Sequence, residues 1–577
     1  MIDWLKGSVT RRNGAWKALA LMAALGLAGC GSPAVATSSS TPSELTIALS
    51  PQSPLDWWPP LVPTINCGTV SGGGISGPDM YLPVLWISSK DTIDYSQSIA
   101  QSITVSNNDQ TYTIRLNPKW HWSNGQPVTA QNVLFDWKLI DASSQPTSVL
   151  PYCFASEGGV PSQWKSVTVN GPYTLTVSTT SPVNPTWFEL NGLAQLVPVP
   201  SAWDKYSSMT QELHFIDKLG NEPLNPIFKI VDGPYDISQY VPDQYWLYKA
   251  NPNFDGNPKP AIPKISYQYE GSSDTTFAAV LKGSVDIAPI SFSLLKSIHQ
   301  AKGYHLVTQP LFGYFMGALN MRPNAQGVGG LFAKLYARQA LQLGIDQPAI
   351  IRAVYHGYAT PTYGPVPVRP ANVFYDKGLK NPYPYDPARG KALLEANGWR
   401  MQNGVLEKGG HKLAFQILYP SGDQSSQDIA QILKADWGQE GIDATLNPQS
   451  IDNVSNDIGS VSNSSKWVVQ IGFKWSYEPD YYPSGDGLFN SLQGFNPGAY
   501  QNARMTRLID QSVQGGTAAQ ITERFNAYQI YASQQLPVLW MPTPDGLFLE
   551  KNTVHGWGSA YNDIQAFVPN NDLSFSK

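Results

Sequence analysis

The chain has 577 residues, of which 42% are hydrophobic and 14% charged, and its formal net charge is −5. A chain of this length exceeds what one hydrophobic core organises, so we expect two or three lobes. The acidic balance argues against nucleic acid as a partner. Beyond the first 30 residues, no apolar run is long enough to span a membrane.

The N-terminus has the pattern of an export signal. An apolar run at 18–28, too short to cross a bilayer, follows four basic residues, Lys6, Arg11, Arg12 and Lys17. We therefore predict a signal peptide over residues 1–29. The run ends in Leu-Ala-Gly-Cys30, which resembles the lipobox of bacterial lipoproteins and implies that the Cys30 thiol is acylated. The alternative is an ordinary cleaved signal with an incidental cysteine.

Residues 30–43 are rich in serine, threonine and proline and carry no charge, which predicts a flexible tether between the lipid and the folded body. Two cysteines follow, Cys67 and Cys153. In an oxidising compartment such a pair is more often bridged than free, so we predict a Cys67–Cys153 disulfide. Two buried thiols are the alternative, since the sequence gives no distance between them.

The segment 112–140 combines a strand, a turn and a helix. Its first residues alternate between apolar and polar side chains, as a half-buried strand requires. A Ser-Asn-Gly turn occupies 123–125. Thr129 then stands where a helix N-cap is expected, and Val133 and Trp137 share one face of that helix.

Further element boundaries can be predicted along the second half. Asp346 and Asp386 are each placed to cap a helix that has proline in its first turn, and Gly283 suits the end of a short helix. The apolar residues between Phe332 and Leu343 fall on one helical stripe. A strand is predicted at Ile442–Leu446. Alternating helices and strands are typical of layered α/β architecture.

These segments, in this order, resemble the family 5 solute-binding proteins, which are the peptide and nickel receptors of ABC importers. Besides 112–140, the resemblance rests on the Val-Leu-Lys-Gly-Ser-Val-Asp run at 280–286, the Arg-Gln-Ala step at 338–340 and the element that opens with Asp386-Pro387. It covers most of the mature chain. Arg338 is expected to be structural.

The resemblance implies an α/β fold with two hinged lobes, of the periplasmic-binding-protein type and its large peptide-binding class (type II). Lobe I would carry an additional strand-rich subdomain. The chain is expected to cross between the lobes near Pro310 and Pro542. Lobe I then comprises residues 44–309 and 542–577, and lobe II comprises residues 310–541.

No local motif of a catalytic or metal site is found. The sequence lacks a nucleophile elbow and a phosphate-binding loop, none of its seven histidines forms an i, i+4 pair, and there is no C-x-x-C. We therefore expect no enzymatic activity, no metal and no other cofactor. A triad could still be assembled from distant residues, which keeps a secreted hydrolase as the alternative from another class.

The main candidate site is the segment Trp475–Asp486. The resemblance implies that an acidic residue here receives the α-ammonium group of a peptide, and a carboxylate in a closing cleft can form such a charge-assisted hydrogen bond. The acidic residue of the family usually lies three positions after the tryptophan, where this chain has Glu478. We favour Asp480 as the anchor, with Glu478 as the alternative; both could also be solvated loop carboxylates, and Asp486 is expected to be one.

Aromatic residues make up 12% of the chain, which suits a cleft that holds its ligand by apolar and stacking contacts. We include Trp475, Tyr477 and Tyr481 among the expected ligand contacts. Trp57 and Trp58 follow a first strand predicted at Glu44–Ser50 and resemble the part of lobe I that lines the cleft. For each of them, a position in the core is the alternative.

The resemblance as a whole implies a monomeric, extracytoplasmic receptor that is anchored to the cell membrane by its lipid. It would bind a small solute, an oligopeptide, in the interlobe cleft and deliver it to the permease subunits of an ABC importer. An extended peptide backbone can be held by strand-like pairing while its side chains enter roomy pockets. An oligosaccharide, favoured by the tryptophans, and a metal chelate, disfavoured by the sparse histidines, are the alternatives.

Overall fold

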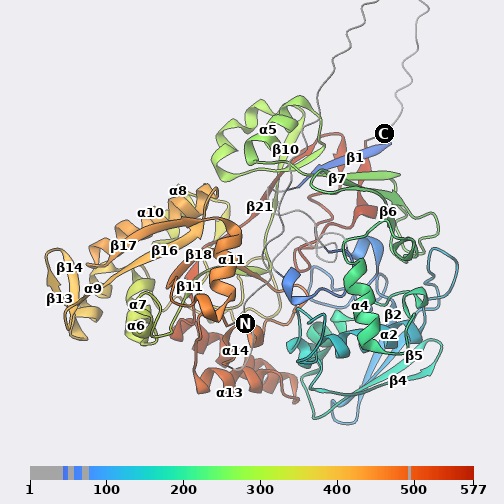
Figure 1. The fold of residues 1–577 in the computed structure, drawn as a ribbon, viewed down its shortest axis with the longest axis horizontal. Helices are drawn as coiled ribbons and strands as arrows, with labels where there is room; N and C mark the ends of the chain where they lie inside the picture. The colour runs from blue at the N-terminus through green and yellow to red at the C-terminus, as the bar shows by residue number, and fades with distance from the viewer. Residues whose placement is uncertain (1–42, 50–56, 68–76, 492–495, 577) are drawn as a thin grey trace, which may run out of the picture. The chain divides into compact units, whose positions relative to one another are not determined.

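The computed structural model describes residues 43–49, 57–67, 77–491 and 496–576. The predicted signal peptide, Cys30 and all of the tether except Ser43 lie outside these residues. Most of the strands described belong to three sheets (Figure 1). The largest is seven-stranded, in the order β10 (Tyr304–Gln309), β21 (Gly546–Lys551), β9 (Ile287–Pro289), β1 (Glu44–Ala48), β8 (Lys264–Gln268), β7 (Tyr245–Ala250) and β6 (Tyr235–Val241).

The second sheet is five-stranded and supplies the candidate site. Its order is β17 (Asp443–Gln449), β16 (Ala414–Pro420), β18 (Val469–Ser476), β11 (Gly313–Leu319) and β19 (Leu539–Met541). β16 runs parallel to both of its neighbours, whereas β11 pairs antiparallel with β18 and β19. The helix α10 (Gln424–Gln439) packs on β16 and β17 (Figure 1).

A four-stranded antiparallel sheet contains the segment that opens the predicted strand-turn-helix pattern. Its order is β2 (Ala100–Ser106), β3 (Thr111–Leu116), β5 (Thr174–Thr179) and β4 (Trp164–Gly171). The smaller pairings are β12 (Ala359–Thr360) with β20 (Thr543–Pro544), β13 (Arg400–Gln402) with β14 (Val405–Lys408) and β15 (His411–Lys412), and β22 (Val554–His555) with β23 (Ser574–Phe575).

The helices begin where local capping signals predict. Thr129 precedes α2, and its backbone N–H donates to Asn132 Oδ1 at 2.9 Å. Asp346 and Asp386 accept from the backbone N–H groups of Ala349 and Arg389, which fixes the starts of α8 and α9. Besides α10, the α-helices named among the described residues are α2 (Ala130–Ser143), α3 (Pro185–Trp187), α4 (Met209–Leu219), α5 (Ser273–Lys282), α6 (Gly329–Phe332), α7 (Leu335–Leu343), α8 (Gln347–Ala353), α9 (Pro387–Ala396), α11 (Ile451–Gly459), α12 (Asp486–Phe489), α13 (Ala503–Ser512) and α14 (Ala518–Gln535).

The single helical stripe predicted between Phe332 and Leu343 is wrong. Two helices, α6 and α7, cover this segment, and Lys334 between them is extended, with φ −88° and ψ 128°. The break is stabilised by Arg338, which is buried and donates to the carbonyl of Phe332 at 2.7 Å and to that of Gln535 at 2.9 Å. Arg338 is therefore structural, as expected.

The two large sheets draw their strands from different parts of the chain. Every strand of the seven-stranded sheet lies between 44 and 309 or between 546 and 551, whereas the five-stranded sheet uses only strands between 313 and 541. None of the helices in the described part of the chain combines the length and the apolar character that crossing a membrane requires.

Cys67 and Cys153 form a disulfide, with their Cα atoms 5.6 Å apart. The bridge lies beside an isolated pairing of Pro63 with Tyr152, and the Cys153 N–H donates to the Val62 carbonyl at 2.9 Å. It therefore fastens segment 57–67 to the chain that follows α2.

Candidate ligand-binding site

The candidate segment Trp475–Asp486 begins on a central strand. β18 carries Trp475 and Ser476 as its last two residues, and both pair with the start of β11, Trp475 with Tyr314 and Ser476 with Gly313. The chain then continues without regular structure to α12, whose first residue is Asp486. The acidic residues of this segment are thus held by the sheet at one end and by α12 at the other.

Glu478 lies two residues beyond the end of β18. Its side chain is half-buried, and burial raises its pKa to about 8. None of the described residues forms a hydrogen bond or an ion pair with its carboxyl group. The charge of Glu478 contributes to the raised pKa of Tyr481 and of Tyr561. A desolvated carboxyl group without a partner would gain from a cation brought by a ligand.

Asp480 is buried, with 4% of its surface exposed, and it faces other carboxyl groups. It shares a hydrogen bond with Glu157, which precedes the four-stranded sheet's strand β4 in the chain. Burial raises the pKa of both groups, and the hydrogen bond then lowers the pKa of Asp480 and raises that of Glu157. One of the two groups must then keep its proton, because two buried carboxylates at this distance would repel each other.

Asp486 belongs to the same acidic group, so the expectation that it is a solvated loop carboxylate is wrong. Burial raises its pKa to about 6, and it accepts a hydrogen bond from Asn490 at 2.9 Å. Its neighbour Gly487 lies directly against Glu157, because a Cβ atom there would come within 2.0 Å of Glu157 Oε1. Glycine at this position allows the acidic side chains to pack together.

The aromatic residues of the candidate segment differ in accessibility. Tyr477 is fully buried, its hydroxyl donates to the Pro365 carbonyl at 2.6 Å, and its ring packs beside Phe312. Tyr481 is also buried, whereas Trp475 is half-buried. Tyr477 thus has a structural role, and Trp475 has more surface available for a ligand.

Trp57 and Trp58 lie in the core next to the seven-stranded sheet. The Trp57 indole donates to the Leu61 carbonyl at 2.9 Å, and Trp58 packs edge-on against Tyr240 and Trp246. Both tryptophans are at most 4% exposed. Trp57 and Trp58 thus occupy the core, which was the alternative to a role in ligand binding. Among the described residues, neither contacts the segment Trp475–Asp486.

A pocket of about 230 Å³ lies on the same sheet as the candidate segment. Its walls come from β18, β11 and β19, from the start of α10, and from residues 290–292, and they are largely apolar. Phe292 closes it against Tyr355, with ring centroids 5.0 Å apart. Gly472 of β18 has φ +83°, and a Cβ atom there would lie 2.5 Å from Ser426 Oγ, so the close approach of α10 requires glycine.

Lys474 of β18 lies between this pocket and Glu478 along the chain. Its side chain is exposed, yet desolvation by the surrounding protein lowers its pKa, with no charged neighbour as a cause. The two observations agree if the lysine faces a space inside the protein. No partner for its ammonium group is found among the residues that the structure describes.

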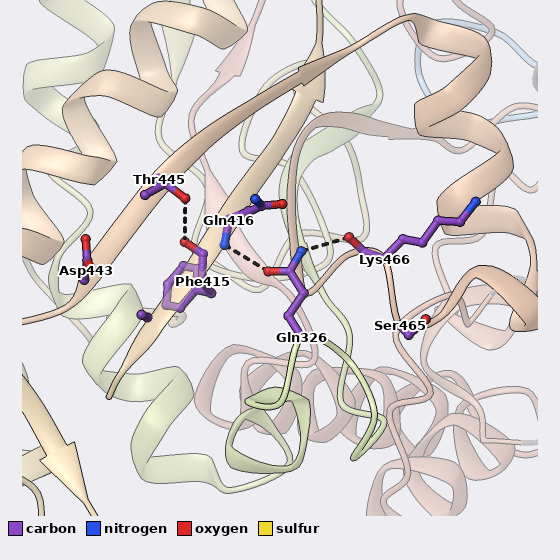
Figure 2. A pocket seen from close by; sticks show the side chains of 8 residues that line it. Gln326, Phe415, Gln416, Asp443, Thr445, Ser465 and Lys466 are labelled. Carbon is purple, nitrogen blue, oxygen red and sulfur yellow. Dashed lines mark hydrogen bonds between the residues drawn. The ribbon is translucent and has the colours of Figure 1, made fainter. Parts of the chain in front are cut away.

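A second hollow, of about 490 Å³, opens at the edge of the five-stranded sheet (Figure 2). The Gln326 side chain reaches into a gap of the sheet there, where it accepts from the Gln416 N–H at 3.0 Å and donates to the Lys466 carbonyl at 2.8 Å. The Lys466 ammonium pairs with Asp457 at 3.3 Å. Because these polar groups already have partners, we place no ligand in this hollow.

Sequence reasoning missed Lys474, Glu157 and the pocket beside Gly472. A single lysine on an alternating strand is indistinguishable from a solvent-facing residue, and Glu157 reaches Asp480 only through a long-range contact. No group of three or more histidine, cysteine, aspartate or glutamate side chains suited to a metal ion occurs in the described ranges.

A model of the bacterial extracellular solute-binding proteins, family 5 (middle), matches residues 94–486. The chain belongs to this family. Among its relatives is the glutathione-binding protein GsiB of Escherichia coli (strain K12), which is 23% identical over 461 residues, or 77% of this chain and 79% of GsiB. Members of the family are binding proteins of ABC importers, so the chain is a receptor and not an enzyme.

Solved structures of this receptor class share the fold. The oligopeptide-binding protein AppA of Bacillus subtilis, in complex with a nonapeptide, matches with a TM-score of 0.74 and 17% identity, over 92% of this chain and 99% of AppA. NikZ of Campylobacter jejuni, in complex with Ni(L-His), matches with a TM-score of 0.73 and 18% identity, over 89% of this chain and 95% of NikZ. The predicted two-lobed α/β fold is confirmed.

Proposed function

We propose that this family 5 receptor binds a short oligopeptide between its two lobes and delivers it to the permease of an ABC importer. The observation that carries the proposal is Glu478, a half-buried carboxyl group without a hydrogen-bond or ion-pair partner among the described residues. The α-ammonium group of a peptide would supply the missing cation and form a charge-assisted hydrogen bond with it.

Glu478 suits this role better than Asp480, which sequence reasoning favours. The surface of Asp480 is covered, and its carboxyl group already shares a hydrogen bond with Glu157. A ligand ammonium group would have to displace that pairing. Glu478 has accessible surface and lies three residues after Trp475, whose half-buried ring would contact the peptide.

In this proposal, lobe I comprises residues 44–309 and 542–577, and lobe II comprises residues 310–541. The strand membership of the two large sheets supports these boundaries. Residues of both proposed lobes then line the pocket beside Gly472, since Ile290 and Phe292 belong to lobe I and Tyr355 and Ser426 to lobe II. A ligand that contacts both lobes stabilises their closed arrangement, which the permease would recognise.

The proposal also includes a monomeric receptor that an acyl chain on Cys30 anchors to the outer side of the cell membrane, after removal of residues 1–29. The lipobox-like sequence before Cys30 supports this part. Expression of the full chain with Cys30→Ser should move the receptor from the membrane fraction to the soluble fraction. Retention of the variant in the membrane fraction would contradict the anchor.

The peptide site is tested by calorimetric titration of the full chain with the peptide Ala-Ala-Leu and with its N-acetylated form. Wild type should bind the free peptide and lose at least tenfold in affinity on acetylation. Glu478→Gln should remove this preference, whereas Glu523→Gln, at an exposed site on α14, should preserve it. Binding of a Ni(L-His) complex or of an oligosaccharide, and not of peptides, would replace the proposed substrate.

A further inference from the structure

Lys474 lies on the face of the five-stranded sheet that forms the pocket beside Gly472. Residues that pair directly across an antiparallel ladder point to the same side of the sheet. In the ladder, Lys474 pairs with Phe315, and Phe315 pairs with Met541. Gly472, Phe315 and Met541 all line the pocket of about 230 Å³. The lysine therefore stands at the border of this pocket.

The ammonium group of Lys474 lacks a counter-charge. Among the described residues it has no hydrogen bond, ion pair or aromatic ring contact, and burial is the only cause of its lowered pKa. Lys474 is exposed, so its ammonium group is accessible to a ligand. An anionic group of the ligand would form a charge-assisted hydrogen bond with it.

The distance to Glu478 sets the size of the ligand. No ion pair joins Lys474 to Glu478 in the described ranges, so neither charge neutralises the other. The two Cα atoms are four residues apart along the chain, which limits the distance between them to about 13 Å. An extended peptide spans about 3.3–3.6 Å per residue, so three or four residues bridge this distance.

We propose that Lys474 is a specificity-determining residue that receives the carboxylate of a short zwitterionic peptide, about three or four residues long, whose ammonium group binds Glu478. This inference rests on the proposed function. The pocket beside Gly472 takes the side chain next to that carboxylate. This side chain is uncharged or apolar, because the pocket walls are mostly apolar and include the Asp423 carboxylate, which would repel a second anion.

The test combines a change in the protein with a change in the ligand. The full chain is titrated with Ala-Ala-Leu and with its C-terminal amide, and wild type should bind the free acid about tenfold or more tightly. Lys474→Met should weaken binding of the acid and bring the acid-to-amide ratio close to one. Lys474→Arg, which keeps the positive charge, should retain most of the preference.

Lys434→Met, at an exposed position on α10, is the matched control and should leave both affinities unchanged. Equal preference for the acid in wild type and Lys474→Met would overturn the role of Lys474, while the loss on N-acetylation would still support the proposed function. If neither form of the peptide binds wild type, both proposals fail. Circular dichroism of each variant separates a loss of binding from a loss of folding.

Discussion

Glu157 and Asp480 share a hydrogen bond between two carboxyl groups, although they come from distant parts of the chain. Such a contact requires that one of the two groups keeps its proton, because two buried carboxylates repel each other. Glu157 belongs to the first proposed lobe and Asp480 to the second. The contact between the two proposed lobes at this point thus depends on protonation of one of these two buried carboxyl groups.

The first prediction concerns pH. Since the pKa values of Glu157 and Asp480 are raised above those of the unfolded chain, the native state binds more protons than the unfolded state above about pH 4. Stability should therefore be highest at acidic pH and fall as the pH rises through the raised values. Thermal unfolding of Glu157→Gln should show a smaller decline in Tm between pH 5.5 and 8.5 than wild type. Parallel declines would contradict the shared proton; Glu523→Gln serves as the exposed control.

A second prediction concerns Arg369, whose Nη1 lies 2.6 Å from Asp545 Oδ2. The arginine is partly exposed, whereas the aspartate is buried, and in the proposed boundaries they belong to different lobes. Arg369→Met leaves the Asp545 charge without its partner and should favour the open arrangement. We expect a severalfold loss of affinity for Ala-Ala-Leu, mainly through faster release, as measured by stopped-flow fluorescence. Arg352→Met, at an exposed site of α8, should have no effect.

The third prediction concerns the disulfide, which closes a loop with a sequence separation of 86 residues. Replacing both Cys67 and Cys153 with serine should lower the free energy of unfolding by about 2–5 kcal/mol. Affinity for Ala-Ala-Leu should change by less than about threefold, because the bridge fastens segment 57–67 to the chain after α2 and not to β18. An unchanged urea midpoint would show that the bridge adds no stability.

The fourth prediction concerns whether Trp58 belongs to the hydrophobic core or to the ligand-binding site. Trp58→Ala removes a side chain that packs against Trp246 and Tyr240, and it should lower the free energy of unfolding by about 3–5 kcal/mol. Trp58→Phe should cost less, since it retains much of the packing. For protein that remains folded, peptide affinity should be unchanged in both variants. A loss of affinity without a loss of stability would assign Trp58 to the ligand site.

Local signals in the sequence predicted local structure well. Thr129, Asp346 and Asp386 cap the helices that their patterns indicate, because a cap depends on residues three or four positions away. The break at Lys334 was not predictable from periodicity, since the apolar stripe continues across it. The backbone carbonyl freed there finds its donor in Arg338, and that contact requires the folded chain.

The segment that contains the candidate site could be predicted, but the role of each residue within it could not. The family resemblance located Trp475–Asp486, but burial and pairing distinguish its two carboxyl groups. Asp480 faces Glu157, and Glu478 has no such partner among the described residues. Neither relationship leaves a signal in a single sequence, because both depend on residues brought together by the fold.

Native mass spectrometry of the purified full-length protein shows whether this receptor holds a short peptide. Molecules that accompany the protein in its native spectrum are released by denaturation and sequenced by fragmentation. We expect peptides of about three or four residues with free termini and an uncharged C-terminal side chain. Release of a sugar or a metal chelate in place of peptides would contradict it.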